Sequence, residues 1–214
     1  MSGRRATHAG AWTRAEAKAL EKLSDPWRVQ QFLDAIPYSA DTFYRCPRRV
    51  LGDRKAHCFD GALFAAAALR RLGFPPLVLD MRAVRDDDHV IAVFRRDGHF
   101  GAVAKSNFVG LRYREPIHRT LRELVLSYFE DFYNDLAEKT LRSYSPTLDL
   151  QRFDHLDWER NDDAAETIAA ALDRLRHFPL LTRAQERCLS KLDGRSYEAG
   201  MLGLDRAGLY KVTD

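Results

Sequence analysis

The segment at residues 56–76, AHCFDGALFAAAALRRLGFPP, constrains the fold more than any other stretch of the chain. Apolar residues recur every three or four positions from Phe59 to Leu72, and Gly73 with the prolines after it marks an end, so the segment predicts a helix. Alanines keep this helix slim, and a helix with so little polar surface is buried on most sides. The chain must therefore fold around it, with Cys58 at its amino-terminal end.

Size and composition are those of an ordinary folded protein. The chain has 214 residues, of which 45% are hydrophobic and 30% charged, and this excludes disordered, fibrous and membrane classes. The net charge is only +3, and arginine pairs alternate with acids instead of forming one basic stripe. We therefore do not expect nucleic acid as a partner.

The cellular environment follows from the apolar runs and the cysteines. No run approaches the roughly 20 apolar residues of a membrane helix, and residues 1–20 lack the apolar stretch of a signal peptide. Cys46, Cys58 and Cys188 form an odd and sparse set, which suits a reducing compartment. We expect a cytoplasmic protein with no membrane partner.

Two capped helices are predicted near the amino terminus. Thr13, followed three residues later by Glu16, has the capping-box pattern, and Asp25 before Pro26 is typical of a second helix start. Residues 37–57 show no sustained period of either kind and contain turn-forming residues. They are predicted to form an irregular surface segment that leads to the cysteine.

Short β-branched runs predict a strand at 77–81 and a hairpin at 89–104 around a turn near Asp97. The rest of the chain predicts mostly helices, at 117–138, 162–178 and 182–192, with an extended stretch at 140–153. We expect an α+β fold in which residues 1–110 form the core and residues 111–214 form a mostly helical elaboration packed on it as one compact unit.

Cys58 is the candidate nucleophile. A helix amino terminus offers free amide groups and a positive dipole end, and both lower the pKa of a thiol. A thiol nucleophile also needs a base, and His89, at the start of the next predicted strand pair, is the candidate. The alternatives are that Cys58 is a buried core residue and that His89 is a strand-edge histidine behind the acidic run 86–88. His57 and His99 are treated as bystanders that can tune or replace the base.

The order of these elements resembles the transglutaminase-like superfamily, which shares its core with papain-like enzymes. The resemblance covers residues 27–108 and rests on Cys58, then ALFAAAALRRLGFPP, LVLDM, DDHVIAVF and RRDGHFGAVAKSN in sequence. It implies a core in which the helix that carries the nucleophile packs on a small antiparallel sheet. It also implies acyl chemistry on a peptide- or protein-derived amide through a thioester, with no cofactor.

The resemblance leaves the third catalytic residue open. The family usually places an aspartate opposite the histidine, but a turn at Arg96–Asp97 puts Ala104 opposite His89. A bulge or a shifted register brings Ser106 or Asn107 there instead, and an asparagine can orient an imidazole. We therefore expect Asn107 as the third member, with Ser106 behind it.

Three other functions remain open. Without the aspartate, the chain can be a binding or scaffold protein that no longer turns over. A metal site is a weaker alternative, because Cys46, His57, Cys58 and Asp60 lack the paired spacing of structural zinc sites. The segment at 105–116 mixes basic and aromatic residues as in nucleotide-binding loops. Among the enzymatic functions hydrolysis is favoured over cross-linking, since no calcium-loop signature is present.

Overall fold

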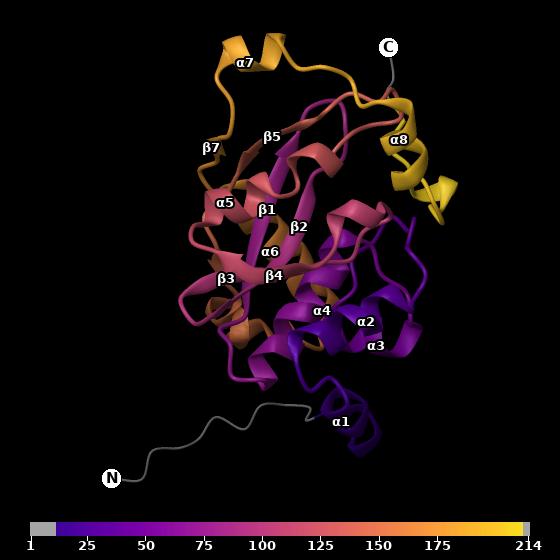
Figure 1. The fold of residues 1–214 in the computed structure, drawn as a ribbon. Helices are drawn as coiled ribbons and strands as arrows, with labels where there is room; N and C mark the ends of the chain where they lie inside the picture. Colours follow the sequence, from indigo (N-terminus) through magenta and orange to yellow (C-terminus); the bar gives the residue numbers. More distant parts are fainter. Residues whose placement is uncertain (1–11, 212–214) are drawn as a thin grey trace.

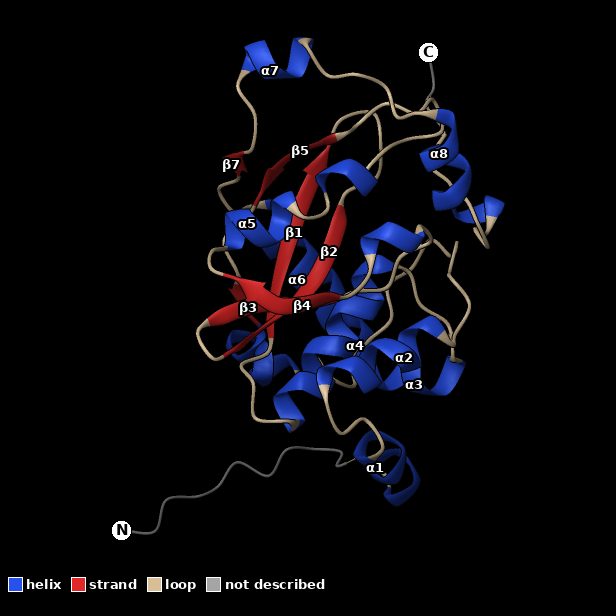
Figure 2. Cartoon of the chain, viewed as in Figure 1, coloured by secondary structure: helices blue, strands red, loops and turns tan. Residues whose placement is uncertain are grey.

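The computed structural model describes residues 12–211 and shows an α+β fold (Figure 1 and Figure 2). The strands are β1 Leu77–Ala83, β2 His89–Arg96, β3 His99–Val103, β4 Arg114–His118, β5 Leu141–Tyr144, β6 Leu148–Asp149 and β7 Phe178–Pro179. They form one seven-stranded sheet in the order β4-β3-β2-β1-β5-β7, with β6 also paired to β1. Every strand pair is antiparallel.

The α-helices in residues 12–211 are α1 Arg14–Glu21, α2 Pro26–Asp34, α3 Pro47–Asp53, α4 Cys58–Arg71, α5 Leu121–Leu126, α6 Asp162–Asp173, α7 Arg183–Arg187 and α8 Gly194–Gly200. Short 3-10 turns are η1 Val109–Leu111, η2 Phe129–Asp131, η3 Leu150–Leu156 and η4 Arg206–Gly208. No helix among these residues combines the length and the apolar character that crossing a membrane requires.

Helices cover both faces of the central strands. Val90 and Phe94 of β2 belong to the core cluster that includes α2, α4 and α6, whereas Ile91 and Val93 pack with α5 and the aromatic residues after it. Figure 2 shows α5 and α6 on either side of β1 and β2. A strand buried on both faces is apolar at consecutive positions, which explains the run HVIAVF. The helix that begins at Cys58 thus packs directly on an antiparallel sheet.

The β2–β3 hairpin is confirmed, but its predicted register is wrong. Arg96 pairs with His99, and the two turn residues Asp97 and Gly98 have φ values of 49° and 82°. Positive φ at both central positions is the hairpin turn that matches strand twist. The turn therefore lies one residue later than counted, and continuing the ladder puts Ser106 and not Ala104 opposite His89.

The amino-terminal helices are confirmed with their caps. The Thr13 hydroxyl accepts a hydrogen bond from the Glu16 amide at 3.3 Å, and Asp25 accepts one from the Arg28 amide at 2.9 Å. The prediction of an irregular segment at 37–57 is wrong in part, because α3 occupies the second half of this range. The amino terminus of α3 is fixed by a distant contact, since the Cys46 amide donates to Asp162 at 2.8 Å. Local periodicity carries no signal for such a contact.

The long helix predicted at 117–138 is also wrong. Strand β4 extends into this range, and α5 ends where Arg114 donates to both the hydroxyl and the carbonyl oxygen of Ser127, each at 3.0 Å. The chain then turns, so that Tyr128 and Phe132 enter the core. These residues have the apolar spacing of a helix in the sequence, but a turn and not a helix places them in the core.

Residues after 110 are less helical than predicted, because they add four strands to the sheet. The extended stretch at 140–153 is confirmed as β5 and β6 and then becomes a 3-10 turn. The helix at 162–178 is confirmed as α6, which ends at Asp173, whereas 182–192 forms only the short α7.

Candidate active site

Cys58 is the first residue of α4, and the residue before it caps the helix. The His57 Nδ1 atom accepts hydrogen bonds from the amides of Phe59 and Asp60, at 3.1 Å and 3.4 Å. Asp60 in turn accepts one from the His57 amide at 3.4 Å. Burial and the charge of Arg45 lower the pKa of His57 to about 4, so its ring is neutral and can accept. His57 is therefore a cap and not a bystander.

A buried ion pair fixes the first turn of α4. Asp60 is fully buried and accepts a hydrogen bond from the Arg45 amide at 2.7 Å, while the Arg45 guanidinium lies 3.6 Å from its other oxygen. Arg45 also donates to Ser39 at 3.0 Å and pairs with Asp41 and Asp53. Burial raises the pKa of Asp60 to about 6. This network holds the loop before α3 against the start of α4, and thus beside Cys58.

His89 begins β2 and is buried. Its Nε2 atom lies 2.8 Å from the carbonyl oxygen of Leu111, and its ring contacts Phe132 edge-on. A carbonyl oxygen only accepts, so Nε2 carries the proton and Nδ1 is left with its lone pair in the neutral ring. Burial lowers the pKa of His89 to about 4. The side chain is therefore a neutral imidazole in a fixed tautomer.

The thiol of Cys58 is protonated near neutral pH. Cys58 is half-buried, and its Sγ lies 3.8 Å from the carbonyl oxygen of Asp88. Burial is the main cause of a raised pKa of this thiol, and the amides of Val90 and Phe59 offset it only in part. The expected lowering by the helix amino terminus is wrong for this conformation. One reason is that the His57 ring already accepts the Phe59 and Asp60 amides.

Two cavities meet at Cys58. The smaller, of about 40 Å³, is lined by Cys58, His89, Ser106 and Asn107 together with neighbouring residues. The structure therefore brings all four predicted site residues to one place. Among residues 12–211, no lysine or arginine lines the larger cavity, of about 450 Å³. Its lining has five carboxylates, from Asp41, Asp80, Asp87, Asp88 and Asp173.

Ser106 and Asn107 do not hold the imidazole. The Asn107 side-chain amide donates to the carbonyl oxygen of Asp205 at 2.8 Å and accepts from the Asp205 amide at 2.9 Å. The Ser106 hydroxyl accepts from the Phe108 amide at 3.0 Å. Both side chains thus have other partners, and the Leu111 carbonyl takes the place predicted for Asn107. Sequence reasoning missed it because every residue has a backbone carbonyl.

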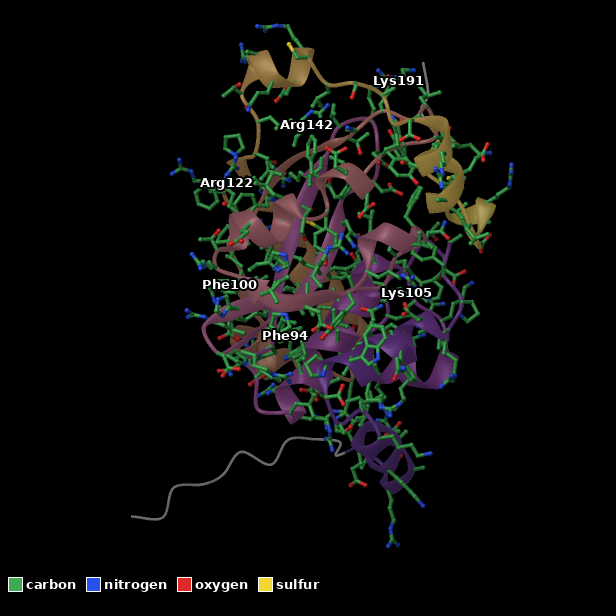
Figure 3. All side chains as sticks on the ribbon, viewed as in Figure 1. Phe94, Phe100, Lys105, Arg122, Arg142 and Lys191 are labelled. Atoms are coloured by element: carbon green, nitrogen blue, oxygen red, sulfur yellow. The ribbon has the colours of Figure 1, made fainter. Side chains whose placement is uncertain are left out.

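The chain that carries Ser106 and Asn107 is anchored to α2. Gln30 exchanges two hydrogen bonds with the backbone of Ala104, at 2.9 Å and 3.0 Å. The Lys105 ammonium (Figure 3) donates to the carbonyl oxygens of Leu33 and Ile36, at 2.8 Å and 2.6 Å. These contacts cap the carboxyl-terminal end of α2. Because it is buried there, Lys105 does not face solvent as a nucleotide-binding lysine does.

Tyr38 is a site residue that the sequence prediction did not include. It lines both cavities, and its backbone pairs with Ala56, two residues before the cysteine. Burial is the main cause of a raised pKa of its phenol; the charge of Cys58 adds to it, and a hydrogen bond with the Cys58 amide opposes it. A protonated hydroxyl therefore stands beside the Cys58 amide.

Residues 12–211 contain no group of three or more His, Cys, Asp or Glu side chains arranged to hold a metal ion. Three of the four residues considered for a metal make other contacts, since the Cys46 backbone amide donates to Asp162 and the His57–Asp60 pair caps α4. No protein-family model matches this chain, and its comparison with curated proteins gives no match either.

Proposed function

We propose that the protein is a cysteine hydrolase or acyltransferase that resembles the transglutaminase-like superfamily and acts on an amide carbonyl. The observation that carries this proposal is the shared cavity of Cys58 and His89, where the Leu111 carbonyl fixes the imidazole tautomer. The packing of α4 on an antiparallel sheet supports a papain/transglutaminase-like core. The substrate is a peptide- or protein-derived amide, and the protein is expected to be cytoplasmic.

In this proposal His89 is the base. Its Nδ1 takes the proton from the Cys58 thiol as the sulfur attacks the carbonyl carbon, while Nε2 keeps its hydrogen bond to Leu111. The imidazolium then protonates the departing amine, and the acyl group stays on sulfur as a thioester. Water or an amine attacks the thioester, gives its proton to His89 and releases Cys58.

The oxyanion of the tetrahedral intermediate needs a hydrogen-bond donor. The backbone amide of Cys58 lies at the nucleophile but is hydrogen-bonded to the Tyr38 oxygen, so the Tyr38 hydroxyl is the donor that remains. Donors that are already fixed in a site stabilise developing negative charge at little cost in reorganisation. We assign Tyr38 this role because its raised pKa keeps the phenol proton in place.

A second candidate is a binding or scaffold protein with the same fold and no turnover. The raised pKa of the Cys58 thiol favours it, and so does the imidazole partner, which is a neutral carbonyl and not the carboxylate that the resemblance implies. A carbonyl can orient an imidazole, but it stabilises an imidazolium less than a carboxylate does.

Acylation by p-nitrophenyl acetate separates the two candidates. The full chain carrying Cys188→Ser is used, because Cys188 is exposed and reacts without a site, whereas Cys46 is buried. If the protein is an enzyme, we expect a burst of about one equivalent of p-nitrophenol and an acetyl group on Cys58. Adding Cys58→Ser abolishes the burst, and adding His89→Gln slows it by about 100-fold or more.

His99→Gln is the matched control, because this histidine lies on the hairpin turn, where its ring bonds to the Asp97 carbonyl. It should leave the burst unchanged. If Cys58 reacts with iodoacetamide at high pH but takes up no acetyl group, the scaffold is the correct function.

A further inference from the structure

The segment at residues 205–210, which we name the strap, lines the candidate site. It follows α8 and forms part of the wall of both cavities that meet at Cys58. Ala207, Gly208 and Leu209 line the 450 Å³ cavity, and Gly208 and Tyr210 line the 40 Å³ cavity. A substrate that approaches Cys58 through either cavity therefore meets the strap.

The side chain of Asn107 binds the backbone of the strap. Its amide group donates to the Asp205 carbonyl oxygen at 2.8 Å and accepts from the Asp205 amide at 2.9 Å. Both polar groups of one side chain are thus used on one strap residue. We name Asn107, which was predicted to be catalytic, the latch of the strap.

Gly208 fits against the oxyanion candidate. A Cβ atom at this position would lie 2.7 Å from ring atom Cδ1 of Tyr38 and 3.3 Å from the Asn107 side-chain nitrogen. Real Cβ atoms do not approach an aromatic ring so closely, so the strap rests on Tyr38 only because residue 208 has no side chain. The two contacts of the strap fall on two residues that line the Cys58 cavity.

The strap is otherwise loosely attached. Arg206 and Ala207 are exposed, and within residues 12–211 the only side-chain hydrogen bonds between the strap and the rest of the chain are those of Asn107. Helix α8 is held separately, for example by the Tyr197 hydroxyl, which donates to the Asp135 carbonyl oxygen at 3.1 Å. Gly203, with a φ of 73°, lies between α8 and the strap. Few buried contacts and a glycine hinge allow the strap to open while α8 stays in place.

We propose that the strap is an autoinhibitory element that closes the Cys58 cleft, with Asn107 as its latch, and that substrates reach Cys58 only when the strap is released. The proposal rests on the proposed function for the identity of the site, but it concerns access and not chemistry. The raised pKa that burial gives the Cys58 thiol agrees with a closed state of the protein.

The test measures alkylation of Cys58 by iodoacetamide in the full chain carrying Cys188→Ser. Asn107→Ala removes both hydrogen bonds to the strap, and Gly208→Ala drives the strap from the Tyr38 ring. Each variant should increase the alkylation rate by about tenfold, the factor that corresponds to about 1.4 kcal/mol of closure free energy. Two variants on opposite sides of the contact keep the test valid if one of them fails to fold.

Gly194→Ala is the matched control, because a Cβ at this position in α8 meets no atom within 4 Å. Its alkylation rate should equal that of the parent. Unchanged rates in folded Asn107→Ala and Gly208→Ala overturn the strap proposal. Alkylation needs neither His89 nor an acyl substrate, so a faster rate without any acetyl burst supports the strap and refutes only the proposed catalysis.

Discussion

The Nε2 atom of His89 donates a 2.8 Å hydrogen bond to the backbone carbonyl oxygen of Leu111. This contact fixes the tautomer of the ring, because Nε2 carries the proton and Nδ1 alone can accept one. Because the Leu111 carbonyl orients the imidazole, Asn107 does not have the orienting role that we expected. The imidazole should therefore keep its tautomer when Asn107 is replaced.

Nitrogen NMR of histidine-labelled protein checks this expectation. At about neutral pH the His89 ring should give the spectrum of the neutral, Nε2-protonated tautomer. The spectrum should be the same in Asn107→Ala, since Leu111 is unaffected. An Nδ1-protonated ring in the parent would contradict the geometry, and a change of tautomer in the variant alone would restore Asn107 as the orienting residue.

Acid should destabilise the protein through His89. Burial lowers its pKa from the ordinary 6.5 to about 4, so the unfolded chain binds this proton more tightly than the folded one. The stability from the neutral ring is complete above the unfolded pKa and is lost as the pH falls from 6.5 toward 4. The loss at about pH 5 is up to about 2 kcal/mol.

Urea unfolding of the parent and of His89→Gln at several pH values measures this loss. The difference in unfolding free energy between the two proteins should shrink as the pH falls, because only the parent has this histidine. His57 adds a loss of the same sign, and Asp60, whose pKa is raised, adds a gain on acidification. Both are common to the two proteins and cancel. A difference independent of pH would show that His89 is not buried as described.

What the sequence predicts well is encoded locally. The caps at Thr13 and Asp25 each need only a neighbour three residues away, and the helix after Cys58 needs only its own alanines and leucines. His89 at the start of β2 follows from the apolar run after it. These features place Cys58 and His89 at the ends of two packed elements, and that is why the candidate pair is predictable.

What the sequence does not predict depends on contacts between distant segments. Three such contacts are the hydrogen bonds His89–Leu111, Cys46–Asp162 and Asn107–Asp205. Each of them joins parts of the chain that share no local pattern. The one-residue error in the hairpin turn has a different origin, because its signal is local. Asp97 and Gly98 form the Asp-Gly pair typical of a two-residue hairpin turn, and both adopt positive φ.

Cys58 should react slowly with iodoacetamide near neutral pH. Burial raises the pKa of its thiol, and only the thiolate is alkylated. Cys188 on the exposed side of the same chain is an internal standard. At about pH 7 mass spectrometry should find Cys188 labelled first, and the rate at Cys58 should still be rising above about pH 9. Faster labelling of Cys58 at about pH 6 would mean that the helix amino terminus dominates after all.

The larger cavity should discriminate between alkylating reagents by charge. Its lining carries five carboxylates, and neither Asp87 nor Asp173 forms an ion pair with a basic side chain in the described part of the chain. The neutral reagent iodoacetamide should therefore outpace the anionic iodoacetate at Cys58 by several-fold more than it does at Cys188. Asp87→Asn should reduce this selectivity, and salt should weaken it. Equal selectivity at the two cysteines would mean that the reagent reaches Cys58 by another route.

The anchor of the Ser106–Asn107 segment depends on a glycine in α4. At Gly61 an added Cβ would collide with the Cβ of Lys105, which must stay in place for its ammonium to reach the α2 carbonyls. Gly61→Ala should destabilise the fold by about 1–3 kcal/mol in urea unfolding, because the collision involves the stem of the side chain and not its flexible end.

Gly52→Ala in α3 is the matched control for this substitution. Its Cβ meets no atom within 4 Å, and alanine favours a helix over glycine by up to about 1 kcal/mol, so the control should be neutral or more stable than the parent. Because Lys105 directly precedes Ser106, Gly61→Ala should also displace the Asn107 latch and speed alkylation of Cys58. Equal stability of the two variants would mean that Lys105 is not packed on α4 as the structure describes.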